Sequence, residues 1–148
     1  MSDPAVIKMK PYGRVSIWTY GMSRNFPGWH LCCNRQASSF LIALIDAMLS
    51  AKWPTKKTVP LVADAVLTSA TGFTAEPRYA RSFEIRFAQS NERGLWQLEE
   101  RDGQISLSLG EDTIKELRKG IIDLTSGEGD YSIGDNPCLW FWWEVTKG

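Results

Sequence analysis

The sequence holds few of the residues that most catalytic and metal-binding sites use. Its 148 residues include one histidine, His30, and three cysteines, Cys32, Cys33 and Cys138. Mechanisms that need two imidazole groups are therefore excluded, and the cysteines do not have the spacing of a zinc finger. Because the number of thiols is odd and Cys32 and Cys33 are neighbours, we expect free thiols in a reducing cytoplasm.

Net charge and long apolar runs are also missing. Seventeen basic side chains balance seventeen acidic ones, which removes the usual argument for binding to nucleic acid or to an anionic membrane surface. No wholly apolar run approaches the ~20 residues of a membrane span. The polar residues 1–4 are not followed by the apolar region of a secretory signal. We therefore expect one cytoplasmic domain, residues 1–148, that binds neither nucleic acid nor membrane.

Familiar catalytic motifs are absent as well. The chain has no Gly-x-Ser-x-Gly nucleophile elbow, no His-Glu-x-x-His helix and no Walker loop. The glycine-rich segment 127–134 looks like a phosphate loop only superficially, because it follows a predicted helix and carries acidic residues, whereas a phosphate cradle precedes a helix. The spacing of those acidic residues is not that of an EF-hand. The sequence therefore assigns no catalytic residue, no metal ligand and no cofactor.

Apolar periodicity predicts both strands and helices. Alternating or β-branched segments predict strands at 15–20, 29–33, 82–88, 95–100, 105–109 and 139–145, with a further strand inside 52–79. Helical spacing predicts one helix over 40–50, capped by Ser38 or Ser39, and a second over about 111–125 with acidic residues in its first turn.

These elements predict an α+β fold. The expected order is β-β-α-β-β-β-β-α-β, with one mainly antiparallel sheet of six or seven strands and both helices packed on one of its faces. Asp102-Gly103 between two alternating runs is a strong hairpin signal, and with segment 82–88 it predicts a three-stranded meander. The N-terminal hairpin and the long connection after the first helix could instead form a second small sheet.

The aromatic residues are the most unusual feature. Three of the seven tryptophans, Trp140, Trp142 and Trp143, lie within four positions. Alternation along a strand places Trp140 and Trp142 on one face and Phe141 on the other. Either both faces belong to the core, or Trp140 and Trp142 are exposed anchors for a partner, because tryptophan contributes strongly to the binding energy of interfaces.

The segment between the first two predicted strands offers further candidate contacts. Residues 21–28 are long for a hairpin connection and include Met22, Arg24 and Phe26, which are residue types enriched at interfaces. Together with Trp140 and Trp142, they predict a surface that binds another protein. The sequence therefore favours a small non-enzymatic interaction module of the inhibitor, immunity or adaptor type, and a homodimer would use the same residues.

Two other functions stay open. His30 and Cys32 are two residues apart in one predicted strand and share a face, and Cys138 precedes the last strand. If those strands are neighbours, the three side chains predict a thiol–imidazole pair or a three-ligand metal site, and hence a thiol- or metal-dependent enzyme. The second alternative is a small-molecule-binding domain with its pocket between helix and sheet.

Overall fold

The protein has an α+β fold, in which helices and strands are both present along the chain. The computed structural model describes residues 4–19, 28–51, 54–63, 78–87, 92–125, 131–134 and 137–142. The elements are α1 (Pro4–Ile7), β1 (Val15–Thr19), β2 (Trp29–Cys33), α2 (Arg35–Ser50), β3 (Thr55–Pro60), β4 (Arg78–Tyr79), β5 (Ser82–Phe87), β6 (Trp96–Arg101), β7 (Gln104–Leu109), α4 (Glu111–Thr125), β8 (Tyr131–Ile133) and β9 (Leu139–Trp142). None of the described helices is long and apolar enough to cross a membrane.

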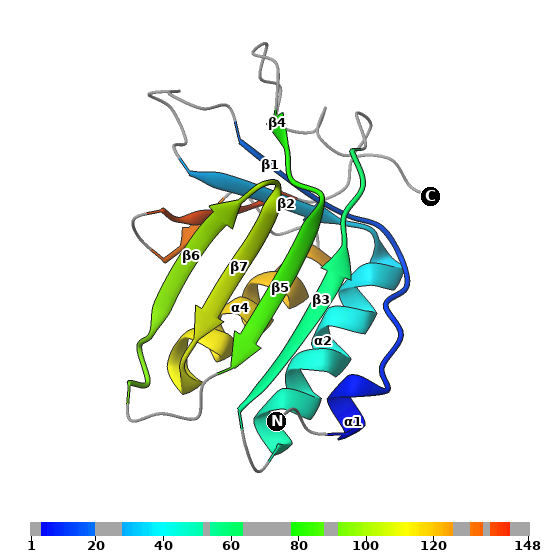
Figure 1. Ribbon diagram of the computed structural model, residues 1–148, viewed down its shortest axis with the longest axis vertical. Helices are drawn as coiled ribbons and strands as arrows, with labels where there is room; N and C mark the ends of the chain where they lie inside the picture. Colours follow the sequence, from blue (N-terminus) through cyan, green and yellow to red (C-terminus); the bar gives the residue numbers. More distant parts are fainter. Residues whose placement is uncertain are drawn as a thin grey trace.

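The described strands form two mixed sheets. One has five strands in the order β4-β1-β2-β9-β8, and the other has four in the order β3-β5-β7-β6. The pairs β2–β9 and β5–β7 are parallel, and the other pairs are antiparallel. The α+β class is thus confirmed, but the single mainly antiparallel sheet is not found. The N-terminal hairpin, β1 and β2, belongs to the separate five-stranded sheet, which crosses one end of the four-stranded sheet (Figure 1).

The β6–β7 hairpin is confirmed, but the meander is wrong. Asp102 and Gly103 have φ angles of 51° and 86°, as a two-residue hairpin turn with both angles positive requires. However, β7 lies between β5 and β6 and runs parallel to β5. The inward side chains of β7 are all buried apolar residues, whereas β6 carries Glu100 opposite Ile105 on the same face. The more polar strand therefore takes the edge position.

The first long helix begins earlier than expected, and the second begins and ends where it was predicted. Asn34, and neither Ser38 nor Ser39, is the N-cap of α2, because its Oδ1 accepts a hydrogen bond from the Ala37 N–H at 2.9 Å. Ser38 is instead buried and lies 3.0 Å from the Cys33 sulfur. Asparagine is as favourable an N-cap as serine, so residue type alone did not identify the correct position.

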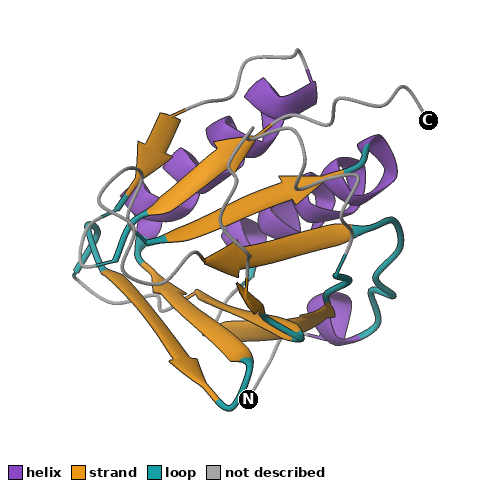
Figure 2. Ribbon diagram, turned by 90° about the horizontal axis from the view of Figure 1, so that it is seen from above, coloured by secondary structure: helices purple, strands orange, loops and turns teal. Residues whose placement is uncertain are grey.

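One core joins both helices to both sheets. Alternate residues of β1, β2 and β9 face this core, among them Ile17, Leu31 and Phe141, all 0% exposed. Seen from above in Figure 2, strands of the five-stranded sheet lie across the helices. On the outer side of the helix pair, Arg118 of α4 donates to both carboxylate oxygens of Asp46 on α2, at 2.7 and 3.2 Å. The core therefore occupies one face of the five-stranded sheet and leaves its second face for other contacts.

Candidate functional site

The second face of the five-stranded sheet carries an aromatic row. Strand register places five residues side by side across the sheet, from β4 to β8, in the order Tyr79, Trp18, His30, Trp140 and Ser132. We call these five residues the aromatic row. They alternate along their strands with residues that face the core, so the row lies on the opposite side of the sheet from the helices.

The aromatic row is buried at its centre and accessible at its ends. Trp18 and His30 are 0% exposed, whereas Tyr79, Trp140 and Ser132 are half-buried. The Trp18 and His30 rings are stacked, with centroids 5.6 Å apart and an angle of 18° between their planes. The centre of the row is therefore a rigid, packed support for the half-buried residues beside it.

Trp142 completes the packing around His30. It lies two residues beyond Trp140 on the same face of the sheet, opposite Cys32, and its ring stacks on His30 with centroids 5.9 Å apart. The Trp142 indole Nε1–H donates a hydrogen bond to His30 Nδ1 at 2.9 Å. Because an indole nitrogen can only donate, Nδ1 must be the acceptor, and a neutral imidazole then carries its proton on Nε2. His30 is thus held between the indoles of Trp18 and Trp142.

The predicted partner-binding residues have different environments. Trp142 is 6% exposed, so the expected exposure of its side chain is not found, and its partner-binding role is not tested; the indole N–H has a buried partner in His30, which removes the polar penalty of burial. Trp140 is half-buried, and its partner-binding role stays a prediction. Met22, Arg24 and Phe26 lie outside the described residues, as do Trp143 and segment 126–130.

His30, Cys32 and Cys138 do not form a common site. His30 Nδ1 is engaged by Trp142, and Cys32 is 0% exposed among aromatic rings. Cys138 lies four residues before Trp142, the partner of Cys32 in the register, which separates the two positions by about 13 Å along the strand. Among the described residues, no group of three or more His, Cys, Asp or Glu side chains is arranged to hold a metal ion. All three cysteines are thiols outside any disulfide bond, as predicted.

Sequence reasoning missed most of the aromatic row. Trp18 and Tyr79 were not singled out, because nothing local indicates that β4 pairs with β1 or that β9 lies beside β2. On the opposite face of the same sheet, the Arg78 guanidinium lies 5.3 Å from the Trp29 ring centroid and donates to Glu100 of β6 at 3.0 Å. Arg78 therefore links the end of the five-stranded sheet to the edge of the other sheet.

The Arg78–Glu100 ion pair makes a small, pH-dependent contribution to stability. The hydrogen bond from Arg78, assisted by the Gly103 N–H, holds the pKa of Glu100 below its ordinary value of 4.5. A carboxyl group whose pKa is lowered in the folded state stabilises the fold at pH values above its ordinary pKa. This stabilisation is lost as the pH falls through the lowered pKa. We expect Glu100→Gln to reduce the free energy of unfolding by no more than ~1 kcal/mol at pH 7 and by less at pH 2. Urea denaturation at the two pH values measures this difference, and an equal loss at both would contradict it.

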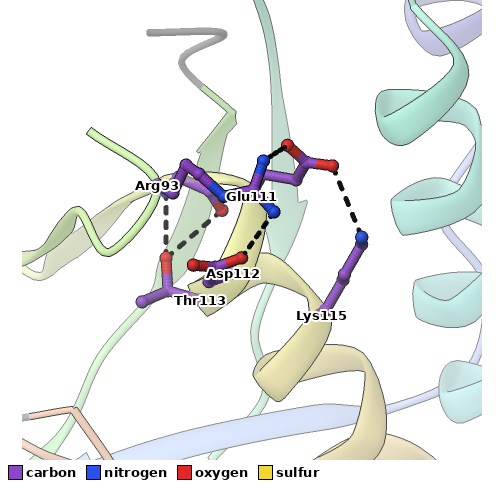
Figure 3. A network of polar contacts seen from close by, with 6 residues as sticks. Arg93, Glu111, Asp112, Thr113 and Lys115 are labelled. Atoms are coloured by element: carbon purple, nitrogen blue, oxygen red, sulfur yellow. Dashed lines mark hydrogen bonds and ion pairs between the residues drawn. The ribbon is translucent and has the colours of Figure 1, made fainter. Parts of the chain in front are cut away.

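A separate polar network surrounds the start of α4 (Figure 3). The Arg93 guanidinium contacts Glu111 and donates to Asp112 at 2.9 Å. Its pKa is raised, first by the hydrogen bond to Asp112 and its charge and then by Glu111. The Thr113 hydroxyl accepts from the Gly110 N–H at 2.9 Å. These contacts place acidic groups and a hydroxyl in the first helical turn, as helix capping requires, so the network is explained without a ligand.

No protein-family model matches the chain, and no curated protein matches it significantly. The functional proposal therefore depends on the geometry of the aromatic row.

Proposed function

We propose that the chain is a non-enzymatic protein-binding domain, of the inhibitor, immunity or adaptor kind, whose contact surface is centred on Trp140. The observation that carries the proposal is the position of this half-buried indole in the packed aromatic row, next to the row's last residue, Ser132. His30 lies on one side of Trp140 and Ser132 of the edge strand β8 on the other. Because the serine side chain is small, it leaves the indole accessible from the edge of the sheet.

The rigidity of the row favours binding of a protein surface. An aromatic side chain that is already held in place loses little conformational entropy when it is covered, so most of the apolar area it buries contributes to affinity. Tryptophan is accordingly among the residues that contribute most to interface energy. A partner that fits this surface presents an apolar side chain to Trp140 and a hydrogen-bonding group to the Ser132 hydroxyl.

Other properties agree with this proposal. Three cysteines in the thiol form fit a reducing compartment such as the cytoplasm, and the balanced charge fits a protein partner better than nucleic acid. The thiol- or metal-dependent alternative has less support, because Cys32 has no exposed surface and His30 Nδ1 is hydrogen-bonded.

We expect Trp140→Ala to weaken partner binding by about 30-fold or more, the loss typical of a residue that dominates an interface. The partner is first captured from extracts of the source cell with the wild-type chain, and its affinity is then measured by calorimetry with purified proteins. Tyr12→Ala is the matched control, since Tyr12 is an exposed aromatic residue, 53% accessible, that packs on Phe40 rather than on the aromatic row.

The proposal requires that Trp140→Ala loses binding at a defined stoichiometry while Tyr12→Ala keeps it. Equal affinity of wild type and Trp140→Ala would contradict it. Sedimentation of the free chain is measured in parallel, because a wild-type dimer that Trp140→Ala dissociates would identify a second copy, instead of a different protein, as the partner.

A further inference from the structure

The contact between His30 and Trp142 depends on the protonation state of the imidazole. Both side chains are buried, at 0% and 6% exposure, and the Trp142 indole N–H points at His30 Nδ1 from 2.9 Å. Nδ1 can accept this hydrogen bond only while it carries no proton. A second proton on the ring would place two N–H groups against each other at hydrogen-bond distance, and one of the rings would have to move.

We propose that His30 is an acid-sensitive latch for the C-terminal strand: protonation of its imidazole releases Trp142 and the adjoining part of β9 from the sheet. β9 lies between β2 and the edge strand β8, so release begins at this end of the five-stranded sheet, at Trp142, before Phe141 leaves the core. The same strand carries Trp140, but this inference does not require the proposed function, because it is tested without a partner.

Among His30 and its described neighbours, the imidazole is the group that ordinarily changes charge near neutral pH. On this face β1 contributes Ser16 and Trp18, β2 contributes Cys32, β4 contributes Tyr79, and β9 contributes Trp140 and Trp142. These described neighbours include no Asp, Glu, Lys or Arg side chain, and the Cys32 thiol and the Tyr79 phenol are the other titratable groups among them. His30 is also the only histidine in the chain, and histidine is the side chain that ordinarily changes charge between pH 5 and 8.

The direction of the pH effect follows from where the proton binds. The latched state holds a neutral imidazole, whereas the released state exposes it and lets it bind a proton. Release therefore becomes more favourable as the pH falls, by at most about tenfold per pH unit for one proton. The two indole faces would attract an imidazolium, but they favour the cation only if the Trp142 N–H no longer points at Nδ1.

Hydrogen exchange measured by mass spectrometry tests the latch. After correction for the intrinsic pH dependence of exchange, peptides covering β9 are expected to lose protection between pH 7.5 and pH 5.5, by up to about tenfold per pH unit, while peptides of α4 keep theirs. His30→Asn offers an amide oxygen near the position of Nδ1 and does not titrate, so it is expected to abolish the pH dependence. The same pH dependence in this variant, pH-independent protection of β9 in the wild type, or equal loss from β9 and α4 would overturn the proposal.

Trp142→Phe gives a second test that does not rely on the folding of His30→Asn. This variant keeps an aromatic ring against His30 and removes the N–H that opposes protonation. We expect nuclear magnetic resonance of the imidazole to show that His30 takes up a proton in the folded variant at a higher pH than in the folded wild type. A wild-type imidazole that takes up its proton at the same pH as in Trp142→Phe would contradict the latch.

Discussion

Replacing Trp142 by alanine is expected to lower the free energy of unfolding by about 3–5 kcal/mol, the range found when buried aromatic residues are truncated. The side chain is 6% exposed and stacks on His30 within the cluster of Trp18 and Cys32. The loss is expected near the upper end of this range, because truncation also leaves the buried Nδ1 of His30 without its donor. Chemical denaturation followed by circular dichroism measures this change.

Two variants separate the causes of that loss. Trp142→Phe keeps most of the buried ring and removes the hydrogen bond to His30, so we expect it to cost about 1–3 kcal/mol. Trp140→Ala is expected to cost less than Trp142→Ala, since Trp140 is only half-buried and part of its surface already contacts water. If Trp142→Ala were as stable as Trp140→Ala, Trp142 would not be part of the packed cluster.

Gly120→Ala is expected to destabilise the protein although it improves helix propensity. In the interior of a helix, alanine is favoured over glycine by ~1 kcal/mol. A Cβ atom at Gly120 would, however, lie 2.8–3.0 Å from three carbon atoms of the Phe141 ring. That ring is 0% exposed and cannot move without disturbing the core, and overpacking of this kind costs about 1–3 kcal/mol. Thermal and urea denaturation measure the net change.

A double variant tests whether the clash with Phe141 is the cause. Phe141→Leu shortens the side chain opposite Gly120, so the alanine is expected to be less destabilising in this background than in the wild type. The two substitutions therefore couple, with a favourable interaction energy in the double-mutant cycle. A Gly120→Ala variant that is more stable than the wild type by ~1 kcal/mol would show that helix α4 does not approach β9 as closely as described.

Local patterns predicted the elements of the fold better than their arrangement. The second helix, Glu111–Thr125, and the strand Trp29–Cys33 have the predicted bounds, because apolar spacing and strand composition are local properties. The order of strands in a sheet is not a local property. Strand β7 lies between β5 and β6, and this central position goes to the strand whose inner face is most completely buried. Glu100 on the inner side of β6 was the available signal that this strand would take an edge.

The candidate site was predicted in part. The sequence drew attention to Trp140 and Trp142, but it did not show that only one of them keeps an accessible side. That distinction depends on register, since β9 pairs with β2 so that Trp142 reaches His30, 112 positions away in the chain. The same register places Cys32 opposite Trp142, four residues beyond Cys138, whereas the adjacency of strands alone had suggested that Cys32 and Cys138 meet.

Hydroxyl-radical footprinting of the free chain and of its complex tests the central claim most directly, because it measures the solvent exposure of each tryptophan side chain in one experiment. In the free chain we expect Trp140 to be oxidised several times faster than Trp142, which is 6% exposed. In the complex we expect oxidation of Trp140 to be suppressed and that of Trp142 to stay low. Equal oxidation of the two residues in the free chain, or oxidation of Trp140 that the partner does not change, would contradict the account.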